Sequence, residues 1–324
     1  MTILRRLLPD RFIMLLVATV VVATLLPATG WLLSAISWAS NAAIVLLFFL
    51  HGARLSRQAV LDGAKKWRLL SVILLFGYGL FPLAMWVAAH ALSGRFAPEL
   101  LAGLLFLGVL PTTVQSSIAY ASIARGNVAA SVIASAASNL LAVVVTPVLF
   151  ALIASSAVAG VSLAGIGKVA TLLLLPFAMG QLLRVPVLPI VQRHAWVAGN
   201  IDKMTIILAV YVAFSQAETE GLWHRIDAGA LVMLAALMAG VLIAVFAGAW
   251  GIGAAMGLDR ADRATLLFAS AHKSLATGAP MARILFPPAL AGAAILPLLL
   301  YHQMQLMLSA VVAARLAKDD QRIT

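Results

Sequence analysis

The sequence predicts an all-α, polytopic membrane protein with ten transmembrane helices. Of its 324 residues 63% are hydrophobic and only 10% are charged, and the mean hydropathy is +1.06. Soluble domains do not have this composition. Apolar runs of about 20 residues, the length that crosses a bilayer, recur ten times between charged or Pro/Gly-rich segments. The chain has no cysteine, so disulfide frameworks and thiolate metal sites are excluded.

The expected spans can be assigned in order along the chain. The first apolar run follows three arginines, as in a signal peptide, but no soluble domain follows it, so we interpret it as a spanning helix. The ten spans are residues 12–28, 31–51, 69–92, 99–124, 128–154, 162–184, 200–217, 229–256, 264–286 and 288–316.

The distribution of Lys and Arg predicts the orientation. With ten spans both termini lie on one side, and only Arg95, Lys168, Arg225 and Arg283 fall on the other side. Lys273 lies inside a span, which leaves seventeen basic residues on the side of the termini. Basic loops face the cytoplasm, so we expect both termini there. This rule accounts for the net charge of +11, and we predict the lipid bilayer as a partner and no nucleic-acid partner.

Ten spans divide into two sets of five with opposite orientation, residues 1–154 and 155–324. Transporters built from such inverted repeats carry interrupted helices at matching positions. The fourth span contains residues 111–117, Pro-Thr-Thr-Val-Gln-Ser-Ser, and the ninth contains residues 270–280, Ser-Ala-His-Lys-Ser-Leu-Ala-Thr-Gly-Ala-Pro. We therefore predict two broken helices. The alternative is that these residues only kink two continuous helices.

The charge of Lys273 at bilayer depth is the main functional signal, because such a charge is costly and usually faces a cavity. It could instead reach the interface or cap a helix C-terminus. The candidate substrate- and ion-binding residues lie on the two interrupted spans and on a polar face of span five, which could also serve only for packing. They are Thr112, Thr113, Gln115, Ser116, Ser117, Ser131, Ser135, Asn139, Ser270, His272, Lys273, Ser274 and Thr277.

Other polar residues narrow the function class. All eleven acids fall in loops, tails or first turns of spans, and no metalloprotease or phosphate-loop motif occurs. We therefore predict that the protein is not an enzyme. Span ten is unusually polar around His302 and Gln305, and these side chains either line a cavity or form hydrogen bonds between helices. Two glycines in span eight, Gly253 and Gly257, have a spacing typical of close helix packing.

The motifs at 111–117, Ala-Arg-Gly-Asn at 124–127, the serines at 131 and 135, and His-Lys-Ser at 272–274 together resemble the bile acid–sodium symporter superfamily. Within it the chain is similar to the sodium/bile acid cotransporter 7-like branch, which has bacterial members. The resemblance implies a panel of spans 1, 2, 6 and 7 and a core of spans 3–5 and 8–10, where broken helices 4 and 9 cross. It also implies transport of a small organic anion by alternating access across a bacterial inner membrane.

The resemblance further implies that Ser116, Ser117, Ser131 and Ser135 match ligands of a first sodium ion. The sequence departs from the family pattern elsewhere. Phe268 stands where relatives have a glutamate that contacts both sodium ions, and Gly77, His272 and Lys273 replace two glutamines and an asparagine. We therefore expect degraded sodium sites and no cofactor other than a sodium ion at the weakened first site.

Our hypothesis is that the ammonium of Lys273 replaces a bound cation, which makes transport sodium-independent. If Lys273 gains and loses a proton during the cycle, a proton that His272 could share, transport is proton-coupled instead. In a variant of this hypothesis, Lys273 anchors the anionic substrate. A different class of function is a transporter-like membrane regulator that binds a ligand or partner without net transport.

Overall fold

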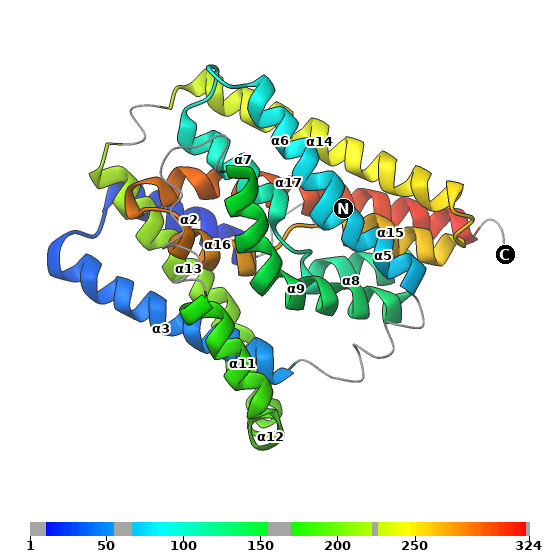
Figure 1. Cartoon of the computed structure of the whole chain (residues 1–324), viewed down its shortest axis with the longest axis horizontal. Coiled ribbons are helices and arrows are strands. Elements are labelled where there is room, and N and C mark those ends of the chain that lie inside the picture. The colour runs from blue at the N-terminus through cyan, green and yellow to red at the C-terminus, as the bar shows by residue number, and fades with distance from the viewer. Residues whose placement is uncertain (1–10, 55–66, 155–169, 222–225, 322–324) are drawn as a thin grey trace. The chain divides into compact units, whose positions relative to one another are not determined.

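The computed structural model describes residues 11–54, 67–154, 170–221 and 226–321, which fold into α-helices, two short π-helical segments and connecting turns (Figure 1). The all-α prediction is confirmed. The chain divides into two compact units. One comprises Met1–Leu55, Gly160–Asp227 and Gly278–Leu296, and the other Ser56–Ala159, Ala228–Thr277 and Pro297–Thr324. The predicted repeat boundary and residues 162–169 of the sixth predicted span lie outside the described residues, and the division into repeats, panel and core stays a prediction.

The first unit is built around α3, which packs against α11 and α13, while α13 also packs against α2. Its complete helices are α2 (Arg11–Leu25), α3 (Gly30–Arg54), η3 (Ala170–Leu174), α11 (Leu175–Leu182), α12 (Arg184–Arg193) and α13 (Ala195–Thr219).

Two glycines allow α3 and α11 to approach closely. A Cβ on Gly52 would lie 2.0 Å from the carbonyl oxygen of Phe177, and a Cβ on Gly180 would lie 1.9 Å from that of Phe49. Both distances are far below van der Waals contact, so only glycine fits at either position. Such small residues let helix backbones pack in membranes, where the hydrophobic effect contributes little between helices.

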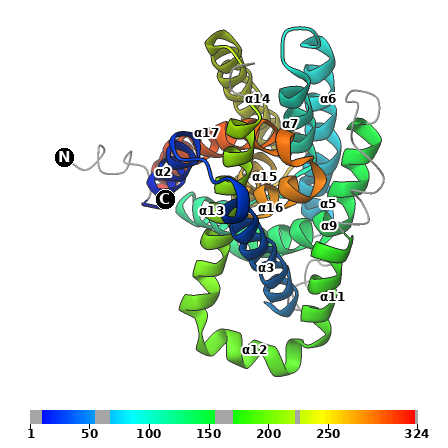
Figure 2. The same cartoon turned by 90° about the vertical axis from the view of Figure 1, so that its left-hand side faces the viewer.

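Helix α12 was not predicted, because only apolar runs of about 20 residues were assigned as helices and residues 185–199 fell between the sixth and seventh expected spans. The structure shows a helix that bends by 93° from residues 171–182 (Figure 2). Pro186 falls in its first turn, where the backbone N–H has no intrahelical acceptor and its loss costs little.

The second unit contains the two interrupted spans. Its helices are α5 (Trp67–Leu75), η2 (Phe76–Leu80), α6 (Phe81–Ala91), α7 (Pro98–Val109), α8 (Val114–Ile123), α9 (Val128–Ala154), α14 (Ala228–Ala255) and α15 (Arg260–Ala271), with the first residues of α16 (Leu275–Leu285) and most of α17 (Pro288–Gln321). Helix α14 lies along α15 (Figure 1). Gly253 of α14 is closely packed, since a Cβ there would lie 2.9 Å from Cγ of Arg263, but Gly257 has a φ of +67° and follows the end of the helix.

Five described helices are long and apolar enough to cross a membrane: Gly30–Arg54, Trp67–Ala91, Val128–Ala154, Ala228–Ala255 and Leu290–Lys318. Helices α7 and α8 together form a further candidate span, bent by 59° at the break, as do residues 171–182 with α12. The protein is therefore a multi-pass membrane protein. The count of ten spans stays a prediction.

Both interruptions lie in the predicted segments, but they have different causes. Pro111 lacks an N–H and restricts the residue before it, and Leu110 is extended with φ −73° and ψ 151°. The second break lies at residues 272–274, where there is no proline. We expected Gly278 and Pro280 to break this helix, yet α16 continues through both. Contacts from other helices must therefore hold the second break open.

The Ala-Arg-Gly-Asn motif connects α8 and α9 and fixes both to the start of α15. Arg125 adopts a φ of +55°, which reverses the chain. Nδ2 of Asn127 then donates to Oδ1 of Asp262 over 2.8 Å, while Oδ1 of Asn127 accepts from the backbone N–H of Ala130 and caps α9. Asp262 itself lies in the first turn of α15, whose N-cap is Asp259. The motif is thus a structural joint of the second unit.

We expect Gly52→Ala and Gly180→Ala each to destabilise the protein by about 1–3 kcal/mol, the usual cost of overpacking, because the new methyl group meets a backbone oxygen. The melting temperature in detergent should fall by several degrees. Gly240→Ala is the matched control, since it is helical and has nothing within 4 Å of its Cβ position; it should leave the melting temperature unchanged or raise it. Equal melting temperatures for all three variants would contradict the packing described.

The Asn127–Asp262 contact can be tested by exchange of its two groups. Asn127→Asp places two carboxylates together and Asp262→Asn places two amides together, so each should lower stability by about 1–3 kcal/mol. The double variant restores an amide–carboxylate pair and keeps an acceptor for Ala130. We expect its melting temperature to recover toward that of the parent, whereas additive losses in the double-mutant cycle would show that the pair contributes nothing as a pair.

Candidate functional site

The site is centred on the side chain of Lys273, at the break between α15 and α16. Its Nζ donates to the carbonyl oxygens of Gly77, Gly108 and Leu110 over 3.0, 2.9 and 2.8 Å. It also lies 4.2 Å from the ring centroid of Phe81, a cation–π contact. The residue is 1% exposed, and none of the described carboxylates forms an ion pair with it. Each of the three N–H donors of an ammonium group thus has a backbone acceptor.

Two of these carbonyls are available because α7 is broken. The last carbonyls of a helix have no intrahelical partner, and they form the negative end of the helix dipole. Gly108 and Leu110 lie at this end of α7. Lys273 therefore caps a helix C-terminus, as one of the sequence alternatives had it. Burial rules out the other alternative, that the side chain reaches the interface.

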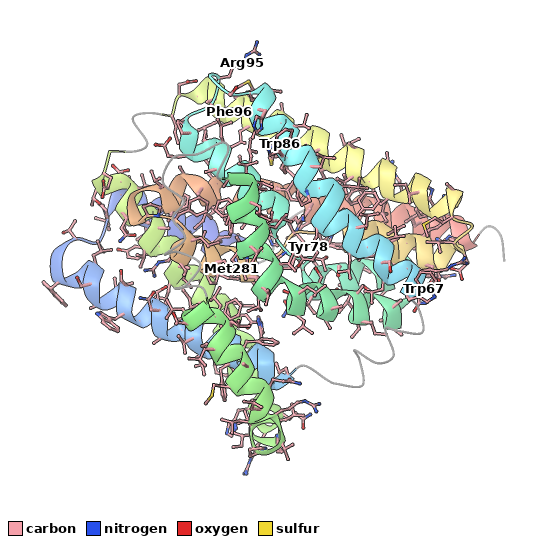
Figure 3. All side chains as sticks on the ribbon, in the orientation of Figure 1. Trp67, Tyr78, Trp86, Arg95, Phe96 and Met281 are labelled. Atoms are coloured by element: carbon pink, nitrogen blue, oxygen red, sulfur yellow. The ribbon has the colours of Figure 1, made fainter. Side chains whose placement is uncertain are left out.

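The third carbonyl comes from the π-helical segment η2, at the middle of the span that runs from α5 to α6. Figure 3 labels Tyr78 of this segment between Trp67 and Trp86, which lie on the flanking helices. A π turn contains one residue more than an α turn and is frequent at functional sites, and here the carbonyl of Gly77 bonds outside its own helix. Gly77 thus contributes a backbone oxygen at a position where the resemblance implied a side-chain ligand.

Helix α17 holds the backbone of Lys273. Oε1 of Gln305 accepts from its N–H over 2.8 Å, and Nε2 of Gln305 donates to its carbonyl over 3.1 Å. The Tyr301 hydroxyl donates to the carbonyl of Ala271 over 2.8 Å, and His302 lies against the Lys273 carbonyl. Of the two alternatives for the polar residues of span ten, these contacts favour hydrogen bonding between helices. They also explain a break without proline, because α17 binds the backbone groups that a continuous helix would pair.

Helix α9 holds the first break in a similar way. The N–H of Thr112 donates to Oγ of Ser138 over 3.2 Å, and Nδ2 of Asn139 donates to the carbonyl of Thr112 over 2.9 Å. Thr277 donates from its hydroxyl to Oδ1 of Asn139 over 3.0 Å. A residue at the centre of each break is therefore tied at both its N–H and its C=O by side chains of a neighbouring helix.

The two breaks also bind each other. The N–H of Ser274 donates to the carbonyl of Pro111, and the Thr113 hydroxyl donates to the carbonyl of Lys273, both over 2.8 Å. The interrupted helices thus meet where the sequence placed their interruptions. Ser274 caps α16, since its Oγ accepts from the N–H of Thr277 over 3.2 Å. Thr113 does not cap α8, because its hydroxyl is used by the other break.

His272 lies beside Lys273 but points into a different set of partners. Its Nδ1 lies 2.8 Å from Oγ of Ser116, and its Nε2 lies 2.7 Å from Oγ of Ser309. The rings of Tyr120 and Phe268 pack edge-on against the imidazole. His272 is 1% exposed, and both ring nitrogens have hydroxyl partners.

The residues expected to bind a first sodium ion are only partly brought together. Oγ of Ser117 and Oγ of Ser135 lie 2.9 Å apart, whereas Ser116 is paired with His272. The hydroxyls of Ser131, Thr112 and Ser270 are buried without a hydrogen-bond partner among the described residues. Gln115 is exposed in the first turn of α8. A sodium ion at this position stays a prediction.

Sequence reasoning missed several residues of the site. The carbonyls of Gly108 and Leu110 carry no side-chain signal, and Phe81 resembles any other apolar residue of a span. Ser309 could have been found, because His302, Gln305 and Ser309 follow one another at three- and four-residue steps and so share one face of α17. The Tyr78 hydroxyl, which donates to the carbonyl of Ser138 over 2.6 Å, was also missed.

Comparisons with known proteins cover almost the whole chain. The family model described as SBF-like CPA transporter family matches residues 10–318. An uncharacterized Pseudomonas aeruginosa protein is 43% identical over 97% of this chain and 96% of its own length. YfeH of Escherichia coli, named as a candidate symporter, is 38% identical over 97% and 95%. Mouse sodium/bile acid cotransporter 7 is 26% identical over 84% and 81%. The chain therefore belongs to the SBF-like CPA transporter family.

Proposed function

We propose that the protein is a secondary transporter of small organic anions that works by alternating access, and that the ammonium of Lys273 acts as a permanent internal cation. The single observation that carries the second part is the set of three carbonyl oxygens around Nζ of Lys273. Converging oxygens of this kind are what hard cations prefer as ligands. Here a covalently attached cation fills the position that a free one would take.

The contacts favour a Lys273 side chain that stays protonated over one that binds and releases a proton in each cycle. An ammonium has three donors, whereas a neutral amine has two donors and a lone pair. Deprotonation would therefore direct the lone pair of Lys273 at a carbonyl oxygen. Of the two coupling schemes that the sequence left open, the geometry supports the sodium-independent one with Lys273 charged throughout.

The same contacts argue against Lys273 as a direct anchor for the substrate, since its donors are all used within the protein. Its charge still favours an anion nearby, because none of the described carboxylates neutralises it. The N-terminus of α8 adds positive partial charge, and its first residue, Val114, is 42% exposed. We propose that the anion binds at this helix end, near Gln115 and the unpartnered hydroxyl of Thr112.

A first sodium site is poorly supported by the available oxygens. The hydroxyls of Ser117 and Ser135 are paired with each other, and Phe268 supplies no carboxylate. Hard cations bind best where several oxygens, including a charged one, surround them. We therefore propose transport without sodium across a bacterial inner membrane, with both termini in the cytoplasm. The first compact unit contains α2, α3, α11 and α13, which correspond to spans 1, 2, 6 and 7 of the proposed panel, together with residues 278–296 from spans nine and ten.

The cation role of Lys273 predicts chemical rescue. Lys273→Ala should lower the free energy of unfolding by about 3 kcal/mol or more, because three buried carbonyls lose a charged donor. Sodium or methylammonium should restore part of the lost melting temperature in detergent, since either ion can enter the vacated position. Lys273→Met fills the volume with an uncharged chain, so it should be destabilised without rescue.

The parent protein and Lys203→Ala, an exposed position, serve as controls. Both should melt at the same temperature in sodium chloride and in choline chloride of equal ionic strength. Stabilisation of the parent by sodium, or a Lys273→Ala variant as stable as the parent, would contradict the proposal.

Transport itself can be tested by counterflow in proteoliposomes. The relatives named as sodium/bile acid cotransporters suggest taurocholate as the first probe, with lactate and benzenesulfonate as smaller anions. Vesicles preloaded with unlabelled anion should take up the labelled anion in sodium-free buffer, at a rate well above that of protein-free vesicles. Binding without counterflow would favour a transporter-like regulator instead.

A further inference from the structure

We infer that each transport cycle carries only the charge of the substrate, so that a negative-inside membrane potential drives organic anions out of the cell. This inference rests on the proposed function and concerns the direction of transport, which depends on how many cations move with the anion. The structure bears on the number of co-transported cations because the ammonium of Lys273 already occupies the proposed cation position.

Lys273 contributes no net charge movement to a complete cycle. Its ammonium is covalently part of α15–α16 and is held by three carbonyls and the ring of Phe81. Whatever distance this charge moves through the membrane field when the loaded carrier reorients, it moves back when the empty carrier returns. A dissociable cation at the same place would leave with the substrate and add one positive charge per cycle.

Among the described residues of the second unit, no carboxylate is placed to recruit another cation beside Lys273. The acids of the second unit within the described ranges lie at helix ends: Glu99 in the first turn of α7, Asp259 and Asp262 at the start of α15, and Asp319 and Asp320 at the end of α17. The hydroxyls of Ser117 and Ser135 pair with each other. The hydroxyls of Ser131, Thr112 and Ser270, which have no partner among the described residues, are neutral oxygens that bring no charge to hold a cation. A monovalent anion therefore crosses with a net charge of minus one.

The membrane potential then acts on the substrate alone. One elementary charge moved through 100 mV corresponds to about 2.3 kcal/mol, or about a 50-fold concentration ratio. A cell with a negative interior would hold such an anion about 50-fold lower inside than outside at 100 mV. The protein would thus lower the internal concentration of its substrate unless the external concentration is very high.

The test uses proteoliposomes in sodium-free buffer with a potassium diffusion potential set by valinomycin. The probe is whichever of taurocholate, lactate and benzenesulfonate shows counterflow, and protein-free vesicles are subtracted. We expect faster uptake with a positive interior, accumulation approaching about 50-fold at 100 mV, and exclusion with a negative interior. Replacement of choline by sodium should change none of these.

The outcomes separate the inference from the function on which it rests. Uptake that does not depend on the membrane potential means that one cation is transported with each anion. Uptake that is faster with a negative interior means that two or more cations are transported with it. Either result overturns the inference while transport stands. Absence of counterflow for all three anions overturns the proposed transport and the inference with it.

Two variants provide an internal check. In Lys273→Ala a sodium ion can enter the vacated position and move with the anion, so sodium should restore transport and abolish its dependence on potential. Lys203→Ala changes an exposed lysine outside the site and should retain the behaviour of the parent protein. A potential dependence of Lys273→Ala equal to that of the parent in sodium would contradict the assigned role of Lys273.

Discussion

The contact of the buried Lys273 side chain with three backbone carbonyls is the interaction on which the two helix breaks of the second unit depend. A charge this deeply buried is tolerated only if each donor has an acceptor, and three backbone carbonyls provide the acceptors. Two of those carbonyls have no intrahelical N–H partner because α7 ends at Val109, and the third comes from a π-helical turn. Removal of the charge would leave three carbonyls without donors, so the broken helix and the lysine stabilise each other.

Broken helices are costly within a membrane, because backbone groups released from the helix find no water. In this protein side chains of neighbouring helices form hydrogen bonds with backbone groups at both breaks. Gln305 binds both the N–H and the C=O of Lys273, Ser138 and Asn139 do the same for Thr112, and the two breaks exchange further hydrogen bonds. The two helix breaks are therefore joined by a polar network inside an apolar fold. Different side chains of that network bind each break.

Sequence reasoning found the class of the fold and the location of the breaks, because composition, apolar runs and buried polar segments are local signals. It identified Lys273 for the same reason. It could not find the partners of Lys273, since backbone carbonyls look alike in every residue and Phe81 differs in no visible way from other apolar residues. It also mistook the cause of the second break, because a proline is visible in sequence, whereas the amide of Gln305 acts across a long separation. Helix α12 was missed because its ten residues are too few to form one of the spanning apolar runs on which the assignment of helices rested.

The shape of the site also explains why a lysine is suited to it. The ammonium is a compact group with three donors, and the three carbonyls and the ring of Phe81 converge on one point. An arginine would bring five donors in a planar fork, of which at least two would be buried without acceptors, at a cost of about 1–3 kcal/mol each. A glutamine would supply only two donors and an oxygen that faces other oxygens. The site is thus fitted to a small spherical charge, as a bound metal cation would be, but the group that occupies it is covalently attached to the chain. On the proposed mechanism, this attachment is the reason why the carrier moves its substrate without a cation.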